Sequence, residues 1–155
     1  MTEKMNGLGG RLENGLHRME VRVYYEDTDF SGVVYHANYL RFAERGRSEM
    51  LHACGIHHAD LEKRDTPLAF AIVKMDLDFI APARIDDVLE VHTVYYNVRG
   101  ARMQIRQVIT RQGEPIWRAD ILAACIDRAG GAARLPPDVV AAIEPHIGQP
   151  ELLPG

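Results

Sequence analysis

Alternating apolar and polar residues predict one β-strand near the start of the chain and four more from residue 69 onward. The first strand spans Met19 to Tyr25, where every second side chain is apolar. The other four predicted strands cover residues 69–79, 88–98, 102–111 and 116–127. Three tight turns separate these four runs, so we expect antiparallel neighbours.

Between the first strand and the later four, the apolar period lengthens to that of a helix. The apolar side chains on one helical face are Leu40, Ala43, Met50, Leu51 and Cys54. Gly55 fits the end of this helix, and Pro136-Pro137-Asp138 opens a short one near the C-terminus. This order predicts an α+β fold in which an antiparallel five-stranded sheet packs on one long helix. One helix covers only one face of the sheet, so we expect a second copy of the chain to cover the sheet surface that remains.

The predicted domain occupies residues 18–145. Residues 1–17 are polar and rich in glycine, which predicts a flexible lead-in, and residues 146–155 read as a tail. No apolar run approaches the roughly 20 residues of a membrane span, and the opening residues lack the apolar core of a secretory signal. We therefore expect a cytoplasmic protein without a transmembrane segment.

Charge and cysteine content narrow the possible ligands. With 18 Lys and Arg against 22 Asp and Glu, the net charge is −4, which argues against nucleic-acid binding but allows a small anionic ligand. Cys54 and Cys125 are far apart and favour free thiols in a reducing compartment. The histidines at 52, 57 and 58 lack the one-face spacing of a metal-binding helix, so we expect no metal site.

The densest group of chemically active side chains lies at residues 24–39, where the first strand meets the long helix. Glu26, Asp27 and Asp29 fall beside the predicted helix N-terminus, whose free N–H groups stabilise negative charge. Composition alone leaves two interpretations open. The carboxylates either form a turn that caps the helix, or one of them acts as a base or nucleophile beside an oxyanion site.

The segments YEDTD at 25–29 and GVVYHANYL at 32–40 resemble the signature of hotdog-fold acyl-CoA thioesterases. The nearest branch is the Tol–Pal-associated acyl-CoA thioesterases, related to 4-hydroxybenzoyl-CoA thioesterase, and the resemblance extends from about Met19 to about Ile143. It implies a hotdog fold and hydrolysis of an acyl-CoA, with short-chain acyl groups favoured. It also implies a homodimer or homotetramer, no cofactor beyond the coenzyme A of the substrate, and an acyl carrier protein as a further candidate partner.

The same resemblance assigns roles to individual residues. Asp29 corresponds to the catalytic carboxylate, as general base or nucleophile, and the backbone N–H of His36 polarises the thioester carbonyl. Ser31 stands where the family commonly has Ala or Gly, which gives no reason for lost catalysis. The expected substrate contacts along this junction are Tyr25, Gly32, Val33, Val34, Tyr35 and Asn38.

Arg99 and Arg102 cluster at a predicted turn, where they could meet the phosphates of coenzyme A or simply be solvated strand ends. Two other functions remain open at this stage. One is a hotdog-fold hydratase or dehydratase acting on acyl thioesters, although its histidine-containing motif is not found. The other is a non-catalytic protein that binds acyl thioesters or an acyl carrier protein as part of an envelope complex.

Overall fold

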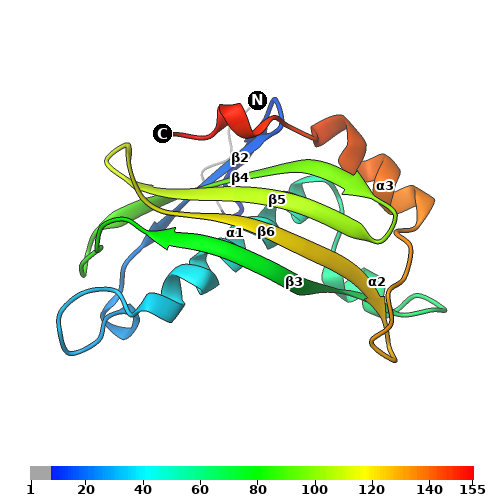
Figure 1. Cartoon of the computed structure of the whole chain (residues 1–155), viewed down its shortest axis with the longest axis horizontal. Coiled ribbons are helices and arrows are strands. Elements are labelled where there is room, and N and C mark those ends of the chain that lie inside the picture. Colours follow the sequence, from blue (N-terminus) through cyan, green and yellow to red (C-terminus); the bar gives the residue numbers. More distant parts are fainter. Residues whose placement is uncertain (1–7) are drawn as a thin grey trace.

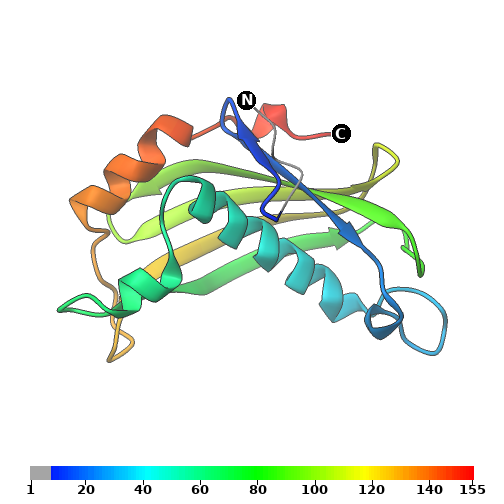
Figure 2. The same ribbon diagram turned by 180° about the vertical axis from the view of Figure 1, so that it is seen from behind.

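A curved antiparallel sheet with α1 (His36–Ala53) along its inner face forms the fold in the computed structural model, which describes residues 8–155 (Figures 1 and 2). The sheet has six strands in the order β1-β2-β4-β5-β6-β3, so β1 and β3 are its edges. The strands are β1 Arg11–Glu13, β2 Leu16–Arg22, β3 Leu68–Phe79, β4 Val88–Arg99, β5 Arg102–Arg111 and β6 Glu114–Asp127. The α+β class is therefore confirmed, whereas the expected count of five strands is one too few.

The additional strand, β1, comes from a hairpin inside the predicted lead-in. Asn14 and Gly15 both have positive φ, at 54° and 84°, which suits a two-residue turn between twisted strands. This turn pairs Leu12 with His17 and starts β2 at Leu16, three residues before the predicted position. Residues 1–7 of the lead-in lie outside the described residues.

The long helix packs on the sheet through the face that the apolar period predicts. Its buried apolar side chains are Tyr39, Phe42, Ala43, Met50 and Leu51. Gly46 allows a close approach between helix and sheet, because a Cβ there would stand 2.7 Å from Val91 Cγ1. Burial of several large side chains, each worth roughly 1.5–3 kcal/mol, holds α1 against the sheet.

The edge strand β3 is longer than most strands and carries a bulge. Its pairing with β6 shifts between Ile72 and Lys74, so the residues facing α1 change from even to odd numbers. Met75 and Leu77 pack on the core, whereas Val73 is 52% exposed. An exposed apolar edge of this kind is a surface on which another strand can pair.

The remaining helices connect and close the sheet. They are α2 His58–Glu62 and α3 Pro137–Ile143, with 3₁₀ turns η1 Tyr25–Asp27, η2 Glu144–His146 and η3 Pro150–Leu152. Val139 and Ile143 of α3 are buried in the core, and the Gly148 N–H donates to the Tyr95 carbonyl at 3.0 Å. No helix within residues 8–155 combines the length and hydropathy needed to cross a membrane.

Candidate active site

The loop between η1 and α1 is held by the backbone and side chain of Asp27. Its Oδ2 accepts the Tyr24 N–H at 2.8 Å, and its carbonyl accepts both the Tyr35 N–H and the Asn38 Nδ2 amide at 2.9 Å. Asn38 is only 5% exposed, and its Oδ1 accepts from Arg41. Of the two interpretations that composition allows, Asp27 therefore fits the structural one, and Asn38 anchors the loop from within α1.

Asp29 is placed differently, because its carboxylate is exposed at the tip of the loop. Its backbone N–H donates to the Val33 carbonyl at 3.0 Å, and its carbonyl accepts the Gly32 N–H at 3.0 Å. Gly32 has φ of +90°, a conformation that favours glycine, and it closes this turn. The loop backbone thus fixes Asp29 while leaving its side chain open to a ligand.

Ser31 binds the Asp29 carboxylate through two hydrogen bonds. The Ser31 N–H donates to Asp29 Oδ1 at 2.9 Å, and the Ser31 hydroxyl donates to the same oxygen. These two hydrogen bonds hold the pKa of Asp29 below its usual range, and the charge of His36 acts in the same direction. Asp29 is therefore an ionised carboxylate at neutral pH, as a base or nucleophile requires.

The N-terminus of α1 provides the second part of the site. His36 is the first residue of this 18-residue helix, and its N–H has no acceptor among residues 8–155. Such an N–H at a helix N-terminus favours negative charge. His36 also lines a cavity of about 310 Å³ with Val34, Tyr39 and Phe79.

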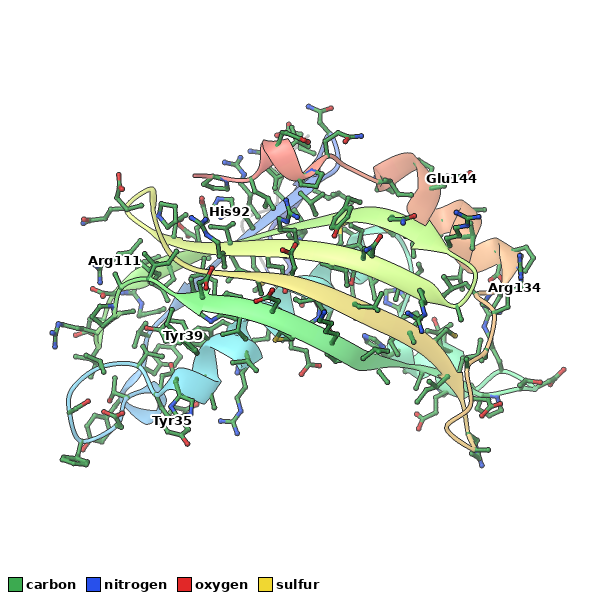
Figure 3. The ribbon with its side chains drawn as sticks, in the orientation of Figure 1. Tyr35, Tyr39, His92, Arg111, Arg134 and Glu144 are labelled. Carbon is green, nitrogen blue, oxygen red and sulfur yellow. The ribbon has the colours of Figure 1, made fainter. Side chains whose placement is uncertain are left out.

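Aromatic side chains line the cavity beside His36. The His36 ring lies edge-on to Phe79 with centroids 6.4 Å apart, and Phe79 also contacts Tyr39 at 5.8 Å. The Tyr39 hydroxyl accepts the Ala83 N–H at 3.0 Å, which ties α1 to the turn after β3. Figure 3 places Tyr35 and Tyr39 at the same end of the sheet. The sequence offered no local signal for Phe79 or Ala83, because they meet α1 only in the fold.

The predicted substrate contacts divide into exposed and buried groups. Tyr25 is 83% exposed and Tyr35 is 45% exposed, so both can meet a ligand or a partner. Val33 forms a backbone bridge with Arg84, whereas Val34 is buried and donates its N–H to the Ala83 carbonyl. Val33 and Val34 therefore hold the loop against the turn after β3.

Arg99 and Arg102 lie far from Asp29 within one chain. They pair across the β4–β5 hairpin, whereas the Asp29 loop joins the opposite end of β4, where the Val23 N–H donates to the Asp87 carbonyl. A strand of 12 residues separates the two ends, about 40 Å at 3.3 Å per residue. Figure 3 places Arg111, a cation that sequence analysis missed, at the same end of the sheet as Tyr35 and Tyr39. It donates to the Pro82 carbonyl at 2.6 Å.

The histidines considered for metal binding lie at the other end of α1. The Nδ1 atoms of His52 and His57 are 3.2 Å apart. Within residues 8–155, no group of three or more His, Cys, Asp or Glu side chains is arranged to hold a metal ion. Both cysteines are free, and burial raises the pKa of the Cys54 thiol to about 11, so it is poorly nucleophilic at neutral pH.

A sheet curved around one helix, with an exposed carboxylate beside the helix N-terminus, is the arrangement of a hotdog-fold thioesterase. The chain belongs to the thioesterase-like superfamily, which it matches over residues 23–143. The family and fold that the sequence predicted are therefore confirmed.

Individual relatives support the same assignment. The chain is 41% identical over 133 residues to the acyl-CoA thioester hydrolase YbgC of Escherichia coli, covering 84% of this chain and 97% of that protein. It is 40% identical over 116 residues to the acyl-CoA thioesterase YbgC of Haemophilus influenzae, covering 75% and 84%. The crystal structure of a probable thioesterase from Bartonella henselae has 40% identity and a TM-score of 0.76, covering 78% of this chain and 99% of that one. The chain is thus an enzyme of the thioesterase family.

Proposed function

We propose that this chain hydrolyses acyl-CoA thioesters to a free carboxylic acid and coenzyme A. The observation that carries the proposal is the Asp29 carboxylate, which is ionised and held by Ser31 in an exposed loop beside the N-terminus of α1. The proposal agrees with the acyl-CoA hydrolase names of its relatives.

The chemistry follows from these two groups. The thioester carbonyl oxygen accepts the His36 N–H, which stabilises the negative charge that develops as the carbonyl carbon is attacked. Asp29 removes a proton from the attacking water, or attacks the carbon itself to give an anhydride that water then cleaves. The C–S bond breaks, and the coenzyme A thiolate leaves with the electron pair and takes up a proton. The imidazole of His36 is not needed for either route.

The active form is proposed to be a dimer in which two β3 edges pair. The apolar side chains of Ile72, Val73 and Phe79 on this strand are each about half exposed. Exposed apolar side chains on an unpaired edge strand favour association with another chain. Antiparallel pairing places the start of β3 in one copy against the end of β3 in the other. A homotetramer formed by two such dimers extends the proposal.

This dimer would bring Arg99 and Arg102 of one chain toward the Asp29 site of the other. Arg102 pairs with Ala124, and Phe70 pairs with Cys125, so the arginine hairpin lies at the end where β3 starts. In the paired dimer that end faces the Asp29 end of the second copy. Arg99 and Arg102 of one chain are then available to the phosphates of a coenzyme A whose thioester lies at Asp29 of the other.

The substrate and setting proposed are a short-chain acyl-CoA in the cytoplasm, with an acyl carrier protein as a further candidate partner. A thiol-release assay on saturated acyl-CoAs from two to sixteen carbons tests both activity and chain length. Release that peaks at short chains supports the proposal, and absence of thiol release from every acyl-CoA contradicts it.

A further inference from the structure

A buried guanidinium without an ion-pair partner lies in the middle of α1. Arg47 is 9% exposed, and its Nη1 donates to Gln107 Oε1 at 3.0 Å. Gln107 is fixed in turn by its Nε2, which donates to the Ala43 carbonyl at 2.8 Å and to Thr93 Oγ1 at 2.9 Å. No carboxylate among residues 8–155 forms an ion pair with Arg47. A buried charge normally requires a partner.

The guanidinium lines a cavity between α1 and the sheet, which we call the Arg47 cavity. Its volume is about 240 Å³, and Phe70, Ile72, Met103 and Ile105 form its apolar lining. A cavity below the usual 300–1,000 Å³ of small-molecule sites suits a group of a few heavy atoms rather than a whole coenzyme A. It therefore combines an apolar wall for a short carbon chain with one buried cation.

Other polar groups also line the Arg47 cavity, and they leave the guanidinium available. Glu44 is exposed and forms no ion pair with Arg47, although its charge acts to raise the pKa of the guanidinium against the larger effect of burial. Ser48 and His58 interact with each other at 3.5 Å, and the Tyr95 hydroxyl donates to the Arg47 carbonyl at 3.3 Å. Apart from the bond to Gln107, the N–H groups of Arg47 have no acceptor among the described residues.

The proposed dimer places this cavity near the Asp29 site of the second copy. Phe70 and Ile72, near the start of β3, line the Arg47 cavity, whereas Phe79, at the end of β3, contacts His36. Antiparallel pairing of two β3 strands brings these two ends together across the dimer. An acyl group whose thioester lies at Asp29 of one chain then points toward the Arg47 cavity of the other.

We propose that the Arg47 cavity receives the far end of the acyl group and selects acyl chains that end in a carboxylate. This inference rests on the proposed hydrolase function and names its substrate class: the coenzyme A monothioesters of short dicarboxylic acids. A terminal carboxylate supplies the charge partner that Arg47 lacks, through two parallel N–H···O bonds. The methylene groups of the chain contact the apolar lining.

Two substrates of equal length test the selection, namely hexanoyl-CoA and adipoyl-CoA, which differ only in the terminal carboxylate. For the wild-type enzyme we expect kcat/KM to favour adipoyl-CoA. Arg47→Gln should lower the ratio of the two kcat/KM values roughly 10- to 100-fold, the range for a hydrogen-bonded charged group. Arg47→Lys should restore part of the ratio. Arg45→Gln, which removes an exposed charge from the same helix, is the matched control and should leave the ratio unchanged.

A structural role for Arg47 would give a different result. If Arg47→Gln lowers kcat/KM equally for both substrates, or if the wild-type enzyme prefers hexanoyl-CoA, the inference is wrong. Thermal unfolding of Arg47→Gln checks that the variant folds. We expect no large drop in Tm, because removing a buried charge without an ion-pair partner offsets the loss of its hydrogen bond to Gln107.

A binding measurement separates this inference from the proposed function. Calorimetric titration of the Asp29→Asn protein measures the affinity for adipoyl-CoA and hexanoyl-CoA without turnover. Tighter binding of adipoyl-CoA that is lost in Asp29→Asn/Arg47→Gln supports the cavity assignment even if no thioester is hydrolysed. If Asp29→Asn and Asp29→Asn/Arg47→Gln bind adipoyl-CoA with equal affinity, the cavity assignment is wrong, even if the wild-type enzyme hydrolyses every acyl-CoA.

Discussion

Ser31 donates two hydrogen bonds to a single oxygen of Asp29, one from its backbone N–H at 2.9 Å and one from its hydroxyl. The two residues belong to the same tight turn, so the arrangement is local and needs no other part of the fold. It lowers the pKa of the carboxyl and orients it, while the other oxygen, Oδ2, has no donor among the described residues. Ser31 is therefore a positioning residue for the proposed reaction.

Ser31→Ala should shift the pH dependence of hydrolysis. The hydroxyl bond is the main cause of the lowered pKa of Asp29, and alanine removes it while keeping the backbone bond. Because the ionised carboxylate is the active form, the acidic limb of the kcat/KM profile should move to higher pH. At pH 8, where Asp29 is ionised in both proteins, the loss should stay within about tenfold. An unchanged acidic limb in the pH profile would contradict the proposed link between the Ser31 hydroxyl, the pKa of Asp29 and the rate.

The buried histidine of β2 should make the fold sensitive to acid. Burial lowers the pKa of His17 from its usual 6.5, so the unfolded chain binds a proton more readily. The contribution of neutral, buried His17 to the free energy of unfolding is therefore complete above pH 6.5 and is lost as the pH falls below that value. Tm should drop between pH 7 and pH 5, and the drop should be smaller in His17→Gln. His92, whose pKa is also lowered by burial, accounts for part of the remaining drop.

The control for this measurement is His146→Gln, which changes a histidine that is not buried. Its Tm should fall with pH as steeply as that of the wild-type protein. A His17→Gln protein with the full acid sensitivity would exclude His17 as a cause.

Charge reversal at the β4–β5 hairpin tests whether Arg99 and Arg102 bind the phosphates of coenzyme A. Arg99→Glu/Arg102→Glu should raise KM roughly tenfold or more and change kcat less, because these residues lie far from the reacting carbonyl. The effect should shrink at high salt. Arg45→Glu, on the exposed side of α1, is the control. Equal KM values for the hairpin variant and wild type would remove both arginines from the binding site.

Substitution on the edge strand tests the dimer. Val73→Asp places a charge at the exposed bulge of β3 and should give a single-chain mass by light scattering, together with a large loss of activity, since the site needs two chains. Ile85→Asp changes a residue of similar exposure, 45% against 52%, outside β3 and should keep the wild-type mass. A wild-type protein that is itself monomeric would contradict the dimer.

The sequence predicts the order of the main elements well, because their apolar periods are long and regular. It misses β1, whose three residues are too few to show a period. Every odd position of residues 69–79 is apolar, which indicates one continuous apolar face, and only the pairing with β6 reveals the bulge. Local motifs thus predict elements, while register depends on neighbouring strands.

The candidate site also combines residues that a local motif reveals with residues that only the fold brings together. Asp29 and His36 could be found from the sequence because they belong to one continuous motif. Phe79 and Arg47 could not, since their relevance depends on contacts between β3, α1 and β5 that are distant along the chain. Ser31 was noted only as a replacement of a smaller residue, because its hydrogen bonds to Asp29 appear only when the turn is built.

The central claim, that Asp29 carries out hydrolysis, is tested most directly by thiol release from a short-chain acyl-CoA with Asp29→Asn. Asparagine preserves the shape and an oxygen acceptor for Ser31, but it is neither a base nor a comparable nucleophile. We expect kcat to fall at least about 100-fold while Tm and acyl-CoA affinity stay close to wild type. Glu26→Gln removes an exposed carboxylate from the same loop and should retain activity. Near-normal turnover by Asp29→Asn would contradict the account.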